Sequence, residues 1–341
     1  MTDKQFDLFG EPLEQSPKPE PEPKLKRAEP KVLPAPPDDA LSALGHAIPA
    51  DVHLGTSSWS FPGWAGMVYG GSYSDVQLAR RGLAAYAAHP LLRAVGIDRT
   101  FHAPISESVF RSYAKQAQEV APGFRFLVKA PMLFTGPRLR SDEGPWTDNV
   151  SFLNASLATA QFVMPATQGL GDACGPLVFQ FPPLGPKFTR VPHKFADALA
   201  EFLVALPKLL GPAFYAVELR DPELLTDDYL AALCAGGATH CIAIHARMPQ
   251  ASEQARFWRE AGRLPLVIRW SLHSGMKFEE AKERYAPFNA LVDEDPEGRA
   301  QVASLALEAT RARQESFIIA NNKAEGSAPL TIRKLADLLR E

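Results

Sequence analysis

Downstream of residue 50 the chain alternates between two hydrophobic periods. Short runs rich in β-branched and aromatic residues are typical of buried strands, and Ala- and Leu-rich stretches with a helical period separate them. The eight strand-like runs start at Val52, Ala94, Phe124, Pro176, Phe214, His240, Pro265 and Ser316. The helical stretches include residues 74–89, 106–120, 150–164, 192–206 and 327–339. Strands that alternate with helices usually pair in parallel, which predicts an α/β protein.

The number of strand and helix units narrows the fold class. Eight units within residues 51–341 match a (β/α)8 TIM-like barrel, a fold that usually takes about 250 residues before insertions. An open, doubly wound parallel sheet is the alternative.

Alternation within each run predicts which side chains point into the barrel. In residues 240–246, Ile242 and Ile244 share one face, while Ala243 and His245 share the other. We expect the bulkier apolar face to meet the outer helices, so that the opposite face points inward. Catalytic groups collect at the carboxyl ends of barrel strands, because eight loops converge there. The inward positions near those ends are Asp98, Lys129, Glu218, Arg220, His245 and Arg269.

The first 50 residues differ in composition from the rest. They contain 10 of the 31 prolines, and residues 17–37 are mostly Pro, Glu and Lys with few apolar side chains to bury. Burial cannot offset the entropy cost of ordering such a segment. The composition predicts a disordered tail over residues 1–50 and a barrel domain over residues 51–341.

A short motif lies near the start of this tail. Residues 5–9 read Gln-Phe-Asp-Leu-Phe and resemble the bacterial sliding-clamp-binding peptide. In such a peptide the amide of Gln5 would meet polar groups at a pocket rim, while Leu8 and Phe9 would fill an apolar cleft. A start-of-chain segment that folds back on the body is the alternative.

Overall charge and cysteine usage exclude several classes of protein. The chain has 36 basic and 39 acidic residues, a net charge of −3, so strong binding to duplex nucleic acid or an anionic membrane is not expected. Cys174, Cys234 and Cys241 have no metal-ligand or paired spacing. No uncharged apolar run is long enough to span a bilayer. We therefore expect a cytoplasmic protein.

Six ordered motifs carry a family resemblance. They are GTSSWSFPGW from residue 55, AVGIDRTF from 94, GFRFLVKAP from 123, GPLVFQFPP from 175, AVELRDP from 216 and NNKAEGSAP from 321. In this order they resemble the motifs of the YecE-like family, also called domain of unknown function 72. The resemblance covers about residues 52–339 and implies a TIM-like barrel.

The chain departs from the family pattern at acidic positions. The family's second strand usually reads Val-Glu-Ile-Asn-Ser-Thr-Phe-Tyr, whereas here Gly96 replaces the Glu, Asp98 the Asn and His102 the Tyr. The family's Asn-Asn-Asp ends here in Lys323. The changes at Gly96 and Lys323 each remove a carboxylate, the second adds a base, and both favour anions at the barrel mouth.

The inward charged residues suggest both a ligand and a chemistry. Lys129, Arg220 and Arg269 outnumber Asp98 and Glu218 by one charge, which favours an anionic or polyhydroxylated ligand. Glu218 is the candidate general base, because burial can raise a carboxyl pKa. Lys129 can hold charge, carry a proton or act as a Schiff-base amine. A buried structural ion network is the alternative reading.

Further candidates surround these groups. His245 is a candidate catalytic residue with Glu218, Lys129 and Asp98, although a core histidine is the alternative. Gly326 and Ser327, the latter as N-cap, suggest a phosphate seat at a helix N-terminus. Trp59 could stack on a sugar or pack a lid. The predicted substrate-binding residues are Arg220, Arg269, Asn321, Asn322, Ser57, Trp59, Gln180, Gly326 and Ser327.

A metal site is the weaker alternative. Its possible ligands are Asp98, His102, Glu218, His245 and His273, and no two have a diagnostic spacing. We therefore predict no cofactor and an enzyme of isomerase, lyase or hydrolase type that acts by acid/base chemistry on a small phosphorylated or sugar-like anion. The alternative is a DNA-metabolism accessory or nucleic-acid-processing protein that its tail tethers to the replication clamp.

Overall fold

The computed structural model describes residues 31–140, 144–262, 264–273 and 275–340. The clamp-like motif with Gln5, Leu8 and Phe9 lies outside these ranges. Eight parallel strands close into a barrel in the order β1-β10-β9-β8-β7-β6-β3-β2. Because β1 pairs with both β10 and β2, the sheet has no open edge, and the barrel prediction is confirmed over the open sheet. The strands are β1 Val52–Thr56, β2 Ala94–Ile97, β3 Arg125–Lys129, β6 Cys174–Gln180, β7 Phe214–Glu218, β8 Thr239–Ile244, β9 Leu266–Trp270 and β10 Ser316–Ala320.

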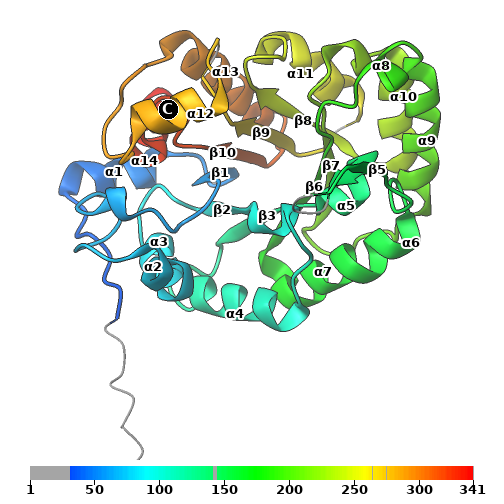
Figure 1. The fold of residues 1–341 in the computed structure, drawn as a ribbon. Helices are drawn as coiled ribbons and strands as arrows, with labels where there is room; N and C mark the ends of the chain where they lie inside the picture. The colour runs from blue at the N-terminus through cyan, green and yellow to red at the C-terminus, as the bar shows by residue number, and fades with distance from the viewer. Residues whose placement is uncertain (1–30, 141–143, 263, 274, 341) are drawn as a thin grey trace, which may run out of the picture. The chain divides into compact units, whose positions relative to one another are not determined.

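Helices surround this barrel (Figure 1). Some of them begin at side-chain caps: Ser74 and Gln77 form a capping box at α2, and the Thr226 hydroxyl accepts from the N–H of Tyr229 at α10. A two-stranded antiparallel hairpin, β4 Arg138–Arg140 and β5 Trp146–Asp148, lies between β3 and β6 in sequence. The helices are α2 Asp75–Arg81, α3 Leu83–Ala87, α4 Glu107–Gln118, α5 Met132–Thr135, α6 Ala155–Ala158, α7 Met164–Leu170, α8 Pro186–Thr189, α9 Pro192–Ala205, α10 Asp227–Gly236, α11 Ala251–Glu260, α12 Phe278–Tyr285, α13 Pro296–Arg311 and α14 Ala328–Leu338.

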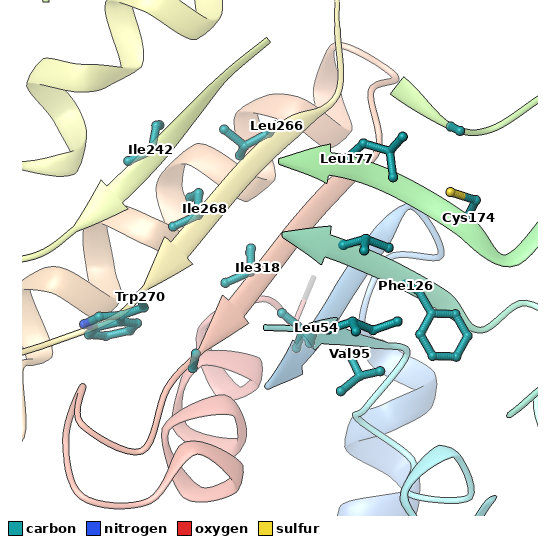
Figure 2. Close-up of a cluster of buried hydrophobic side chains, with 14 of the residues drawn as sticks. Leu54, Val95, Phe126, Cys174, Leu177, Ile242, Leu266, Ile268, Trp270 and Ile318 are labelled. Atoms are coloured by element: carbon teal, nitrogen blue, oxygen red, sulfur yellow. The ribbon is translucent and has the colours of Figure 1, made fainter. Parts of the chain in front are cut away.

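Strand alternation divides the core into two layers, as predicted. The bulky side chains of Phe126, Ile242 and Ile268 belong to the large cluster that includes residues of the outer helices, and Figure 2 shows them among buried strand residues. A separate cluster within the barrel combines the small residues Ala94 and Ala216 with branched ones such as Leu127 and Ile319. These side chains fill the barrel interior, and the charged residues lie toward the carboxyl ends of the strands.

The ordered domain begins upstream of the predicted boundary at residue 50. Val32 is buried, and helix α1 (Asp39–Ala47) starts at Asp38, whose side chain accepts a hydrogen bond from the N–H of Leu41 at 2.6 Å. Arg93 donates to the carbonyl oxygens of Gly45 at 2.7 Å and of Pro49 at 2.6 Å. The predicted boundary of the tail at residue 50 lies too far downstream. The prolines around α1 dominate the average composition of this region and hide the short amphipathic helix.

A long connection between β9 and α13 runs close to the carboxyl ends of the strands. Two glycines allow its backbone to approach. A Cβ atom at Gly63 would overlap the carbonyl oxygen of Pro287, and one at Gly326, where φ is +119°, would lie 2.5 Å from the carbonyl oxygen of Ala290. These contacts fix residues 286–292, and the preceding helix α12 brings Phe278 to the barrel mouth.

Candidate active site

Strand ends from separate parts of the chain form one pocket of about 150 Å³. Lys129 ends β3 and Glu218 ends β7, while Arg269 lies one residue before the end of β9. Of the predicted site residues, the pocket is lined by Ser57, Asp98, Lys129, Gln180, Arg220, His245, Arg269 and Asn321. Glu218 lies beneath it and is completely buried. The convergence inferred from strand parity is therefore present.

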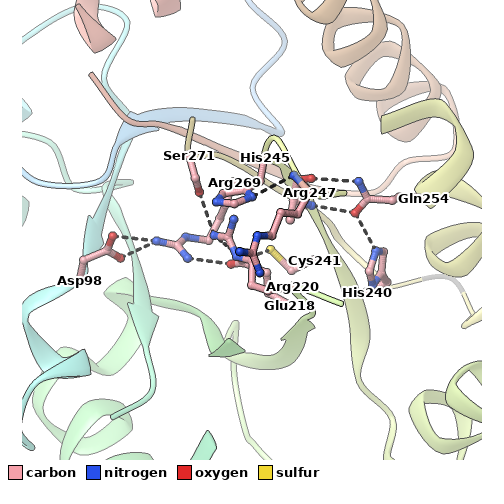
Figure 3. Close-up of polar contacts among 11 residues, drawn as sticks. Asp98, Glu218, Arg220, His240, Cys241, His245, Arg247, Gln254, Arg269 and Ser271 are labelled. Atoms are coloured by element: carbon pink, nitrogen blue, oxygen red, sulfur yellow. Dashed lines mark hydrogen bonds and ion pairs between the residues drawn. The ribbon is translucent and has the colours of Figure 1, made fainter. Parts of the chain in front are cut away.

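A buried ion network organises the charged residues, as Figure 3 shows. One guanidinium nitrogen of Arg269, Nη1, donates to Glu218 Oε2 at 2.7 Å. The other, Nη2, contacts both oxygens of Asp98 at 2.7 and 2.8 Å. Arg220 pairs with the second oxygen of Glu218 and donates to the hydroxyl of Ser271 at 3.2 Å. Arg269 is thus held between two carboxylates, and Glu218 between two guanidinium groups.

This network reverses the expectation for Glu218. Burial alone would raise the pKa of this carboxyl, but the charges of Arg220, Arg269 and Lys129 outweigh burial and lower the pKa to about 2. A carboxylate with such a low pKa is a weak base. The prediction that burial makes Glu218 the general base is corrected: its observed contacts orient two arginines.

Lys129 is buried differently from the two arginines. Its side chain is nearly enclosed, and its Nζ lies 3.6 Å from the centre of the Phe101 ring. Burial lowers its pKa from 10.5 to about 8, although Asp98 and Glu218 act in the opposite direction. Lys129 therefore changes its protonation close to neutral pH, which suits a group that exchanges a proton.

Arg220 lines the pocket, and one of its guanidinium nitrogens has no hydrogen-bond partner among the described residues. The residue is 8% exposed, and this nitrogen, Nη1, is buried. A buried guanidinium N–H without a partner is costly, and a ligand oxygen can satisfy it.

His245 lies in the pocket wall in its neutral form. Burial, followed by the charge of Arg220, lowers its pKa to about 4. Its Nδ1 lies 3.3 Å from the backbone N–H of Arg247 and accepts from it, so the neutral ring carries its proton on Nε2. At neutral pH His245 is therefore a hydrogen-bond donor and a weak base.

Uncharged polar groups complete the wall. Asn321 donates through Nδ2 to the hydroxyl of Ser57 at 2.8 Å, and its Oδ1 accepts from the N–H of Lys323 at 3.0 Å. Because the Ser57 oxygen accepts this bond, its own proton remains available to a ligand. Gln180, which is buried at the end of β6, adds an amide.

Two of the predicted substrate-binding residues have structural contacts instead. Trp59 donates to the carbonyl oxygen of Leu78 at 3.1 Å and packs against Tyr113. These contacts favour the alternative in which Trp59 packs a lid rather than stacking on a sugar. Asn322 accepts from Trp64 Nε1 at 3.2 Å and from the N–H of Ala328 at 2.9 Å, which caps α14.

The predicted phosphate seat at the N-terminus of α14 is closed. Ser327 is fully buried at the N-cap position, but its side chain makes no capping hydrogen bond. Gly326 packs beneath Ala290 and Val292 of the β9–α13 connection. The prediction of a phosphate seat at Gly326 and Ser327 is therefore corrected. The α14 sequence contains no signal that another segment of the chain covers this end of the helix.

Ser271 and Phe278 line the pocket and Phe101 lies against Lys129, and none of the three was predicted from the sequence. Ser271 follows Arg269 by two positions, so strand parity could have identified it. Phe101, beneath the ammonium group of Lys129, lies in a quoted family motif that was assigned no role. Phe278 comes from the β9–α13 connection, where no periodic pattern indicates that it reaches the mouth.

The described ranges hold no cluster of three or more His, Cys, Asp or Glu side chains arranged to bind a metal ion. The possible ligands His102 and His273 do not line the pocket. In the same ranges, every helix is too short or too polar to cross a membrane.

Two solved structures share this fold. A DUF72 family protein from Enterococcus faecalis has a TM-score of 0.60 and 16% identity, over 85% of this chain and 96% of that protein. A DUF72 family protein from Thermotoga maritima has a TM-score of 0.52 and 19% identity, over 85% of this chain and 99% of that protein. At such identities the likeness concerns the fold alone. No curated protein matches the sequence significantly.

The sequence profile of the family described as "Protein of unknown function DUF72" matches residues 53–341. This match spans the barrel from its first strand to the end of the chain, including every strand that lines the pocket. The chain therefore belongs to the DUF72 family.

Proposed function

We propose that this protein is an enzyme that binds a small anionic substrate at the barrel mouth and moves a proton with Lys129. The observations that carry the proposal are the buried, unpartnered Nη1 of Arg220 and the buried amine of Lys129, two residues that line the same pocket.

The charge of the pocket supports an anion. Asp98 and Glu218 both pair with Arg269, and Glu218 also pairs with Arg220. Two carboxylates therefore face three cationic side chains, and Lys129 forms no ion pair with a carboxylate of the described residues. A carboxylate or phosphate group between Arg220 and Lys129 would balance the surplus charge and satisfy the unused guanidinium donor.

The remaining wall suits a polar, compact molecule. A volume of about 150 Å³ admits only a small substrate. The Ser57 hydroxyl and the Gln180 amide offer hydrogen bonds to hydroxyl or carbonyl groups, as a sugar-like compound would require.

Lys129 replaces Glu218 as the proton-exchanging group. With a pKa near 8, its amine is partly neutral at physiological pH, whereas Glu218, with a pKa near 2, binds a proton only in strong acid. Asp98 is engaged by Arg269, and His245 is a weak base. The reaction class supported best is therefore proton transfer to or from a bound anion, as in an isomerase or lyase.

Calorimetric titration with inorganic phosphate tests the anion site. We expect saturable binding to the full-length protein and a loss of about tenfold or more in affinity in Arg220→Met, since a charge-assisted bond contributes roughly 1.5–3 kcal/mol. Arg111→Met, which removes an exposed arginine on α4, is the matched control and should bind like the wild type. Unchanged affinity in a folded Arg220→Met variant would contradict the proposal.

A further inference from the structure

The amine of Lys129 has the surroundings of a nucleophile. The ring of Phe101 lies 3.6 Å from Nζ, which places an apolar surface against the amine. The two nearby carboxylates, Asp98 and Glu218, form ion pairs with Arg269 and Arg220. Lys129 is therefore buried among charges without a carboxylate partner that fixes its proton, and its free side faces the pocket.

A second lysine at the mouth shows what distinguishes this position. Lys323 also lies over an aromatic ring, with its Nζ 4.0 Å from the centre of Phe278. It is less buried than Lys129 and does not line the pocket. In the described part of the chain, Lys129 is the one lysine of the pocket wall, so aromatic contact alone does not define the site.

The other polar groups of the pocket are poor nucleophiles at neutral pH. The guanidinium groups of Arg220 and Arg269 stay protonated, and Asp98 holds Arg269 with both oxygens. His245 uses Nδ1 as an acceptor for a backbone N–H and carries its proton on Nε2. Only the amine of Lys129 combines a lone pair, a lowered proton affinity and an open side.

We infer that Lys129 forms an imine with the carbonyl group of a small anionic aldehyde or ketone, such as a keto acid or a phosphorylated ketone. The inference rests on the anion site proposed above, and it specifies the substrate class of that site. Arg220 would hold the carboxylate or phosphate, which brings the carbonyl carbon to the amine.

The step balances without an added reactant. The neutral amine attacks the carbonyl carbon, a C–N bond forms, and the carbonyl π electrons move to oxygen. The oxygen takes up the proton that the ammonium group released before the attack and one further N–H proton. It then leaves as water, which breaks the C–O bond and leaves a protonated imine on Nζ. Overall, an ammonium group and a carbonyl give an iminium ion and water, and two N–H protons leave with the oxygen. The iminium then withdraws electrons from the adjacent carbon more strongly than the carbonyl group did.

Reductive trapping tests the imine directly. The full-length protein is incubated at neutral pH with pyruvate or with dihydroxyacetone phosphate, each with sodium cyanoborohydride, and modified peptides are mapped by mass spectrometry. We expect Lys129 to carry the adduct and to exceed exposed lysines by roughly 300-fold, the ratio expected at neutral pH from the neutral amine fractions of groups with pKa values near 8 and 10.5. Acetone, which lacks the anionic group, should label Lys129 far less.

Variants and competition separate the possible outcomes. Lys129→Met should lose the adduct, Lys323→Met should keep it, and added phosphate should suppress it. Mapping on the wild type makes the test independent of whether Lys129→Met folds. Absence of an adduct at Lys129, or equal labelling of Lys129 and Lys323, overturns the inference. If phosphate still binds through Arg220 in that case, the proposed anion site stands and only the imine fails; if phosphate does not bind, both fail.

Discussion

Glu218 and Arg269 form a buried ion pair across 51 residues of sequence, with 2.7 Å between Oε2 and Nη1. Removing two charges from water is costly, and further partners offset that cost. Arg220 contacts the other oxygen of Glu218, and Asp98 contacts the other nitrogen of Arg269. The pair therefore holds the two arginines at fixed positions around the pocket.

Glu218→Gln should destabilise the fold by about 3–5 kcal/mol, because the substitution leaves two buried guanidinium groups without their shared carboxylate. Chemical denaturation monitored by circular dichroism measures the loss. Glu308→Gln breaks the exposed pair with Arg259 and should cost less than about 1 kcal/mol. Similar costs for the two substitutions would show that the buried network is not a major source of stability.

The same carboxylate predicts a loss of stability in acid. The folded state holds the pKa of Glu218 near 2, against 4.5 for an ordinary glutamate, so the unfolded chain binds the proton first as the pH falls. The contribution of Glu218 is complete above about pH 4.5 and is lost progressively toward pH 2. Unfolding free energies in this range should fall more steeply for the wild type than for Glu218→Gln. Parallel curves would contradict the lowered pKa.

Strand periodicity was sufficient to predict the barrel and the convergence of the inward charged residues on one pocket. Side chains alternate across a strand, so once Ile242 is assigned to the outer face, His245 must lie on the inner face. Assigning the bulkier apolar face of each strand to the outer helices then identified the inward residues. Ser271 obeys the same rule. These features depend on residues that are close together in the sequence, so a single sequence is enough to predict them.

The chemistry of the site could not be predicted in the same way. Whether burial raises the pKa of Glu218 or two arginines lower it depends on distances between strands β7 and β9 and the loop after β7. The role of Asn322 and the closure over Gly326 depend on a segment that packs from elsewhere in the chain. Residue types identify possible partners, and only the folded arrangement selects among them.

The adjacent Asn321 and Asn322 should separate binding from capping. Asn322→Ala removes the acceptor for the Ala328 N–H and should cost about 1–2 kcal/mol of stability with little effect on phosphate affinity. Asn321→Ala alters the pocket wall next to Ser57 and should weaken phosphate binding with a smaller loss of stability. Calorimetric titration and thermal unfolding of both variants test this division. Weaker phosphate binding in a stable Asn322→Ala variant would return Asn322 to the substrate-binding set.

The clamp-binding hypothesis is independent of the barrel site. If residues 5–9 form a sliding-clamp peptide, Leu8 and Phe9 enter an apolar cleft, and Leu8→Ala with Phe9→Ala should abolish binding to purified bacterial clamp. Calorimetric titration of the full-length protein measures this. Lys129→Met should bind the clamp as the wild type does. Absence of wild-type binding, or binding that survives both tail substitutions, would remove the hypothesis.

We expect Lys129 to reduce the stability of the fold at neutral pH, because the burial that makes its amine reactive also disfavours its charged form. Burial, together with the charges of Arg269 and Arg220, lowers its pKa to about 8 despite Asp98 and Glu218, whereas an unfolded lysine has a pKa of 10.5. Between these values the unfolded chain binds more protons, so this group makes stability rise as pH increases from about 8 to 10.5.

Lys129→Met should remove that rise and stabilise the fold at neutral pH by roughly 1–3 kcal/mol, since each unit of pKa shift corresponds to about 1.4 kcal/mol. Denaturant unfolding across this pH range measures both effects, with the exposed Lys115→Met as a control that should change neither. A less stable Lys129→Met protein at neutral pH would mean that the ammonium group is a net structural contact. In that case a free amine would not be readily available, and both proton transfer and imine formation at this position would lose their physical basis.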